Sequence, residues 1–192
     1  MLARASQRLS AAVSRIERAL LMLLMAAIAV FVLMNVLLRA AGVTIAWADE
    51  MAVYSMILSG FIGASLMLRA RTDPAVLLLH EVMRQRGRRV LHLIVSVVCV
   101  SFGLFLLHAS WLWFDPLGLA RAGFDVSAFE MSSFNFVYTD VTPIMGLPAF
   151  WFYLVMPWFG LTVTIHALAN LVEDLGLVAR PVNPARIDAS EV

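Results

Sequence analysis

The sequence has no lysine, a single cysteine and few charged residues of any kind. All 14 basic residues are arginine, and charged side chains make up 14% of the 192 residues, against about a quarter in soluble domains. Because Cys99 is alone, an intramolecular disulfide and a cysteine metal site are excluded, and Cys99 is expected to act as a small apolar side chain. With 62% hydrophobic residues and a mean hydropathy of +0.89, the composition indicates a membrane protein.

No aspartate, glutamate or arginine lies within the long apolar stretches, where pumps and proton relays place ionisable groups. The sequence also lacks a glycine-rich phosphate loop, a nucleophile elbow and a basic aromatic surface suited to nucleic acid. These absences predict that the chain is not an enzyme, that it holds no cofactor or metal, and that it has no nucleic-acid partner.

Four uncharged stretches are long enough to cross a bilayer, which takes about 20 apolar residues. They predict an all-α membrane protein with four transmembrane helices, at about residues 15–41, 47–69, 88–114 and 147–173. Pro148 suits the start of the fourth helix, and Pro157 is expected to kink it. The first stretch exceeds the apolar core of a signal peptide, about 7–15 residues, so we favour an uncleaved anchor over a cleaved signal.

Arginine placement predicts the orientation of the chain. Twelve of the arginines lie in the N-terminal tail, in the link between the second and third helices, or in the C-terminal tail, residues 174–192. Only Arg39 and Arg121 lie on the other side. The positive-inside rule therefore places both termini in the cytoplasm.

The link on the arginine-rich side predicts a short in-plane helix. Asp73 and Pro74 form a helix-start signal, and an amphipathic pattern follows over about residues 74–86. An ordinary solvated turn is the alternative. The candidates for contact with phospholipid or with the membrane interface are Arg84, Arg86, Arg88, Arg89, Trp111 and Trp113.

The opposite link, at about residues 115–140, is long and rich in aromatic residues. Loops of this length are functional or disordered, and the aromatics argue against disorder. An interfacial anchor and a docking surface for another protein both remain open. The charged candidates for docking are Arg121, Asp125, Glu130 and Asp140.

Small residues recur along the second helix. Gly60 and Gly63 each have a small partner four residues away, Ala64 and Ser59 respectively. Such spacing lets another helix approach closely. That helix belongs either to this chain or to another subunit.

The histidines permit one different class of function. His92 and His166 are both expected near the arginine-rich ends of their helices, and two such histidines are able to ligate a haem. A haem-binding anchor of a redox enzyme is therefore an alternative hypothesis. Ordinary hydrogen bonding to neighbours is the simpler interpretation.

The stretch "TIAWADEMAVY" places two acids at the start of the second helix. Asp49 and Glu50 fall in its first turn, where the helix dipole favours negative charge, and Trp47 suits the headgroup level. Asn35 and Arg39 share a face at the end of the first helix. We therefore predict an Arg39–Glu50 or Arg39–Asp49 pair, with water-facing acids as the alternative.

Several motifs together resemble the small membrane subunit of tripartite ATP-independent periplasmic (TRAP) transporters, the DctQ-like family. They are "NVLLR", "WADE", "SGFIGASLMLRAR" and "GLPAFWFYLVMPWFG", and the resemblance spans about residues 15–175. The matching positions are Asn35, Arg39, Trp47, Glu50, Pro148 and Pro157. The link from Asp115 to about Asn135 is longer than the usual family loop. The small subunit of tripartite tricarboxylate transporters shares size and topology, and is a second alternative.

The resemblance implies a division of labour in a bacterial inner membrane. A periplasmic binding protein captures an organic anion such as a carboxylate, and a large multi-spanning permease subunit carries it inward, coupled to sodium. The small subunit is a scaffold that braces the permease and helps to dock the binding protein. Substrate and sodium are accordingly expected on the large subunit.

Overall fold

The structure is a computed structural model that describes residues 2–72 and 85–179, and this part of the chain is helical. Four long helices carry the fold, namely α1 (Leu2–Ala40), α2 (Ala46–Ala70), α4 (Gln85–Phe114) and α8 (Val155–Asp174). Three short helices lie between α4 and α8, namely α5 (Pro116–Arg121), α6 (Val126–Ser133) and α7 (Phe150–Tyr153). The predicted all-α class with four helices able to span a membrane is confirmed.

The helix ends follow local chemistry. Gly42, with φ of 79°, terminates α1 after Ala40, as a left-handed glycine does at many helix ends. Pro157 lies in the first turn of α8, and its ring excludes the carbonyl of Tyr153, so the expected kink is a break between α7 and α8 at Leu154. Pro148 lies before α7, in an isolated antiparallel bridge with Val141, and the helix therefore begins at Phe150 rather than near 147.

The first helix is longer than predicted. It begins at Leu2 instead of about residue 15, and α4 begins three residues early, at Gln85. The added turns of α1 carry residues that bond to α8, and these contacts stabilise a segment whose sequence is too polar to be read as a span. The predicted in-plane helix at 74–86 and the tail beyond 179 lie outside the described residues, except that 85 and 86 belong to α4.

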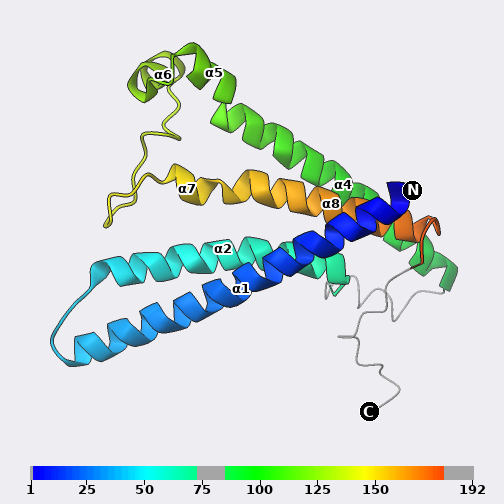
Figure 1. Ribbon diagram of the computed structural model, residues 1–192, viewed down its shortest axis with the longest axis horizontal. Helices are drawn as coiled ribbons and strands as arrows, with labels where there is room; N and C mark the ends of the chain where they lie inside the picture. The colour runs from blue at the N-terminus through cyan, green and yellow to red at the C-terminus, as the bar shows by residue number, and fades with distance from the viewer. Residues whose placement is uncertain (1, 73–84, 180–192) are drawn as a thin grey trace.

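The four long helices form an open array. Helix α4 packs along α8 and α1 along α2, and the two pairs meet through α2 and α8, and through α1 and α8 (Figure 1). The helices converge where the described chain begins and ends, and spread apart at the other end (Figure 1). We call these the terminal end and the loop end.

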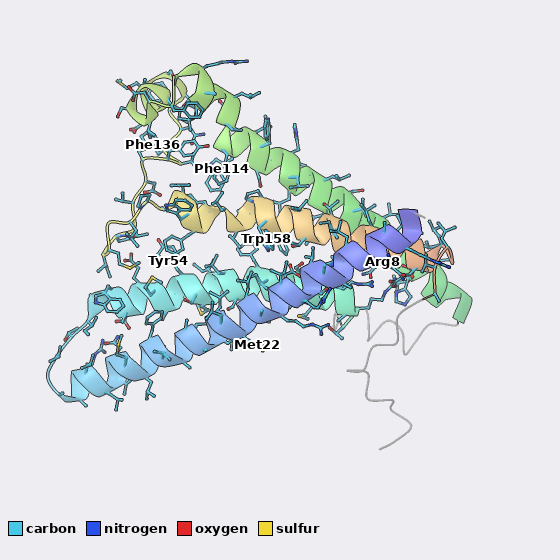
Figure 2. All side chains as sticks on the ribbon, viewed as in Figure 1. Arg8, Met22, Tyr54, Phe114, Phe136 and Trp158 are labelled. Atoms are coloured by element: carbon cyan, nitrogen blue, oxygen red, sulfur yellow. The ribbon has the colours of Figure 1, made fainter. Side chains whose placement is uncertain are left out.

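Glycine and aromatic contacts set the helix spacing. A Cβ added at Gly103 of α4 would lie 2.4 Å from Thr164 Oγ1, and one at Gly160 of α8 would lie 3.1 Å from the Leu107 nitrogen. Between α2 and the α7–α8 segment, Tyr54 stacks on Phe152 with ring centroids 3.9 Å apart (Figure 2). The two glycines let α4 and α8 approach closely, and the stacked rings hold α2 against α7.

Little of the apolar helix surface is covered by the chain itself. In the most hydrophobic 18-residue window of each span, 6% of α1, 22% of α2, 11% of the α4 span and 39% of the α7–α8 span is buried. A membrane protein without a large internal core needs lipid or another helix against these faces.

Candidate functional site: polar contacts at the two ends of the helix array

At the loop end, Asp49 joins α1 to α2. Its carboxylate accepts a hydrogen bond from Asn35 Nδ2 and lies 3.7 Å from an Arg39 nitrogen. The Arg39 and Asp49 side chains are more than half exposed, so this ion pair contributes at most about 1 kcal/mol. The predicted Arg39–Asp49 pair is confirmed. Trp47 is largely exposed and meets Phe31 of α1 edge-on.

Glu50 does not pair with Arg39, and that alternative was wrong. Successive residues of a helix point about 100° apart, so Asp49 and Glu50 cannot both face α1. Glu50 is 8% exposed and accepts the backbone N–H groups of Ile144, at 3.2 Å, and Met145, at 2.8 Å. Hydrogen bonds to a carboxylate are stronger than neutral ones. Glu50 therefore fixes the segment that precedes α7.

That segment is a compact turn over residues 140–149. The Ala149 N–H donates to the Asp140 carbonyl at 2.9 Å, and the Thr142 N–H donates to the Leu147 carbonyl at 2.8 Å. Thr142 is buried, and its Oγ1 accepts from the Leu147 N–H at 3.0 Å. With its backbone groups paired in this way, the turn is a defined surface feature of the loop end.

The Glu50→Gln substitution is expected to loosen this turn. A glutamine offers one acceptor oxygen and places an amide donor against the second N–H, which costs about 1.5–3 kcal/mol. Amide hydrogen exchange at Ile144 and Met145 should accelerate by roughly 10- to 100-fold. Asp49→Asn is the matched control and should leave both amides unchanged. Unaltered exchange in Glu50→Gln would show that the carboxylate does not hold the turn.

The long link between α4 and α7 is folded. Asp115 and Asp125 cap α5 and α6, accepting from the Gly118 N–H at 2.9 Å and the Ser127 N–H at 2.9 Å. Phe129 is buried against the ring of Tyr138. Burial, and then Asp115, raise the pKa of Tyr138, whose hydroxyl donates to the Phe114 carbonyl at 2.7 Å.

The four charged docking candidates do not form one cluster. Asp125 is a helix cap, and Asp140 accepts a hydrogen bond from the Tyr153 hydroxyl at 2.5 Å. Arg121 lies at the end of α5 and Glu130 within α6, and the described residues show no ion pair for either. Large apolar side chains dominate the exposed surface of this link, namely Phe124, Met131, Phe134 and Phe136.

At the terminal end, an ion-pair cluster joins α1, α2 and α8. Arg69 of α2 lies 2.8 Å from Glu173 of α8, and Arg71 lies 2.8 Å from Asp174. Gln7 of α1 donates to the same Glu173 carboxylate at 2.9 Å. The acidic side chains are 2–3% exposed and the arginine side chains 14–18%. Breaking such a buried pair costs far more than breaking an exposed one.

Further hydrogen bonds extend this cluster. Asn170 of α8 donates to the Leu68 carbonyl at 2.8 Å and accepts from Arg69 at 2.6 Å, and Ser96 of α4 donates to Asp174 at 2.9 Å. Arg71 occupies the left-handed position that ends α2, with φ of 56°. Glycine is usual there. The ion pair of the Arg71 side chain offsets the backbone strain of this position.

A second buried bridge joins α1 to α8. His166 bonds through Nδ1 to the Ser10 hydroxyl at 2.8 Å and through Nε2 to Glu17 at 2.9 Å, and all three residues have no exposed surface. The order Ser–His–acid is that of a hydrolase triad. A substrate cannot reach fully buried groups, so this arrangement ties two helices together. Both ring nitrogens are engaged, so His166 fits the simpler interpretation of hydrogen bonding to neighbours and not the alternative of a haem ligand.

The sequence analysis missed both terminal-end clusters. Glu17 and Glu173 lie at the ends of the predicted helices 15–41 and 147–173, but neither was assigned a partner, and His166 was considered only with His92. The sequence did hold a usable signal. Glu17 and Glu173 lie within two residues of the apolar stretches of two different helices, and arginines lie at the end of a third helix, α2.

The small residues that were singled out along α2 lie on two different faces of that helix. Gly60 is exposed and Gly63 is partly exposed, and a Cβ added to either would meet nothing within 4 Å. Ser65 of the same helix is buried and bonded to Thr162 of α8 at 2.9 Å. The small-residue set is therefore shared between an internal and an external face.

Trp111 and Trp113 are substantially exposed on α4. The side chains of Arg84, Arg86, Arg88 and Arg89 lie outside the described part of the structure.

These features define a multi-pass helical membrane protein whose buried polar groups connect helices. Residues 28–177 match the model of the family described as "Tripartite ATP-independent periplasmic transporters, DctQ component". Because the match spans most of the chain, this protein belongs to the DctQ family and is a small membrane component of a TRAP transporter. Comparisons with curated proteins and with solved structures gave no match.

Proposed function

We propose that this chain is the non-catalytic brace of a sodium-coupled TRAP transporter that imports an organic anion such as a carboxylate. It holds the large permease subunit in the inner membrane, with both termini in the cytoplasm, and substrate and sodium bind elsewhere in the complex. The contacts of Asp49, Glu50, Glu173 and His166 support this role, because each connects one helix or loop of this chain to another.

The observation that carries the proposal is the uncovered face of α2. Met56, Gly60, Gly63 and Met67 recur at helical spacing on this face, and within residues 2–72 and 85–179 nothing lies within 4 Å of a Cβ added to either glycine. In lipid, small residues allow helix backbones to approach and gain packing energy. A helix of the permease is the occupant we assign to this face.

A hollow beside Asn35 provides a second contact point at the loop end. It has a volume of about 380 Å³ and is lined in part by Asn35, Arg39 and Asp49. Asn35 is 5% exposed, and its Oδ1 has no hydrogen-bond partner within the described residues. Arg39, whose side chain is 65% exposed, is placed to meet a carboxylate of the permease.

The loop end is where we place the docking of the periplasmic binding protein. The capped α5–α6 link and the turn held by Glu50 both lie there, and both expose apolar side chains such as Phe134 and Ile144. Membership of the DctQ family favours this transporter class over the tripartite tricarboxylate class.

Photo-cross-linking tests the proposed α2 interface. A photoreactive residue at Met56, which is 58% exposed, is expected to capture the large permease subunit in membranes that contain both proteins. The same residue at Val98 of α4, which is 59% exposed, is the matched control and should label lipid. Equal capture from both positions, or none from Met56, would reject α2 as the permease-binding helix.

A further inference from the structure

A groove at the terminal end has a lining suited to an anion. Its volume is about 380 Å³, and it is lined by the start of α1, the end of α2 and the segment after α8. Figure 2 labels Arg8 on the α1 side. The lining residues are Arg4, Gln7, Arg8, Ala11, Arg69 and Val178. None of them is among the predicted lipid contacts, and those on α1 lie outside the residues matched by the family.

The positive charge of this groove is not neutralised by the described chain. Arg69 is paired with Glu173 at 2.8 Å, and the same carboxylate also accepts from Gln7. Arg4 and Arg8 are exposed, and no ion pair to either occurs within the described residues. Among the described residues, these two arginines therefore line the groove without a negative partner.

Hydrogen bonds fix one wall of the groove, and the sequence places the groove at a defined depth in the membrane. The Gln7 amide donates to Glu173 at 2.9 Å and to the Ala179 carbonyl at 3.0 Å, which fixes the wall formed by the segment after α8. Arg69 directly follows Leu68, the last residue of the uncharged stretch of α2. The groove therefore lies where α2 leaves the hydrocarbon, at the level of phospholipid phosphates.

We propose that this groove binds the phosphodiester of an anionic phospholipid from the cytoplasmic leaflet. Arg4 and Arg8 contact the phosphate oxygens, and Ala11 and Val178 contact the glycerol end of the acyl chains. The assignment to the cytoplasmic leaflet rests on the orientation given under the proposed function. The phospholipid site itself does not depend on that orientation. A lipid held there fastens the first turns of α1 to the end of α2.

The test is lipid binding by the full-length chain in mild detergent, measured by native mass spectrometry. Phosphatidylglycerol, zwitterionic phosphatidylcholine and inorganic phosphate are titrated separately. Each arginine near an anionic lipid surface is worth about 1 kcal/mol, so the double variant Arg4→Gln/Arg8→Gln should bind phosphatidylglycerol about 30-fold more weakly. The affinity for phosphatidylcholine should be low in both proteins.

The double variant Arg15→Gln/Arg18→Gln is the matched control. It removes the same charge from exposed positions of the same helix outside the groove, and should retain binding within about twofold. Equal losses in the two variants would show diffuse attraction and overturn the proposal. Displacement of the lipid by inorganic phosphate at similar concentration would assign the groove to a soluble anion and would also overturn it. Loss of this site leaves permease capture from Met56 unchanged, so the two proposals fail separately.

Discussion

The Gly60→Leu substitution is expected to leave this chain folded and to reduce the co-purified permease subunit about tenfold or more. A Cβ at Gly60 meets nothing within 4 Å among the described residues, and Gly60 is exposed, so a larger side chain is expected to point away from this chain. Against a closely packed partner helix the same side chain overpacks the contact, which costs about 1–3 kcal/mol. The measurement is the amount of permease retained on the tagged chain, together with the thermal unfolding of the chain alone.

Gly103→Leu is the matched control for that experiment. A Cβ there lies 2.4 Å from Thr164 Oγ1 and 3.0 Å from the Thr164 backbone nitrogen, so this variant should lower the unfolding temperature of the isolated chain. Wild-type retention of permease by Gly60→Leu would contradict the assignment of α2. Unfolding of Gly60→Leu itself would mean that this face is occupied within the chain.

The Glu173→Gln substitution should be among the most destabilising single changes in the chain. It removes the charge that faces Arg69 at 2.8 Å and Arg71 at 3.8 Å, where the carboxylate is 3% exposed. Loss of one partner of a buried ion pair costs about 3–5 kcal/mol. For a chain of this size, the unfolding temperature in detergent should fall by roughly 10 °C.

Asp49→Asn makes the same chemical change in an exposed pair. Its carboxylate is 56% exposed and lies 3.7 Å from Arg39, so the expected loss is below about 1 kcal/mol. Equal melting shifts for the two variants would show that burial does not set the strength of the terminal-end cluster, and that the helices are held together chiefly by apolar contacts.

The sequence predicted the features that depend on neighbouring residues. Four apolar stretches bounded by charges defined the long helices, and Pro157 marked the break before α8. The Arg39–Asp49 pair was also predictable, because a short turn brings the end of one helix to the start of the next. In each case, helix periodicity or turn chemistry carries the information.

Contacts between distant segments were beyond this kind of inference. Glu50 bonds to backbone groups near residue 144, and backbone N–H groups leave no signature in a sequence. The length of α1 depends on Ser10 and Glu17 meeting His166 on α8, which requires the helix arrangement to be known. The same arrangement decides that Ser65 faces inward while Gly60 faces outward.

The central claim is that this chain acts as a structural partner of the large permease subunit. Co-purification of the tagged full-length chain from cells that express the whole transporter, in mild detergent, tests it most directly. The expected result is one complex whose measured mass contains both membrane subunits and which supports sodium-driven uptake after reconstitution. Recovery of this chain alone, with uptake by the permease unchanged in its absence, would contradict the claim.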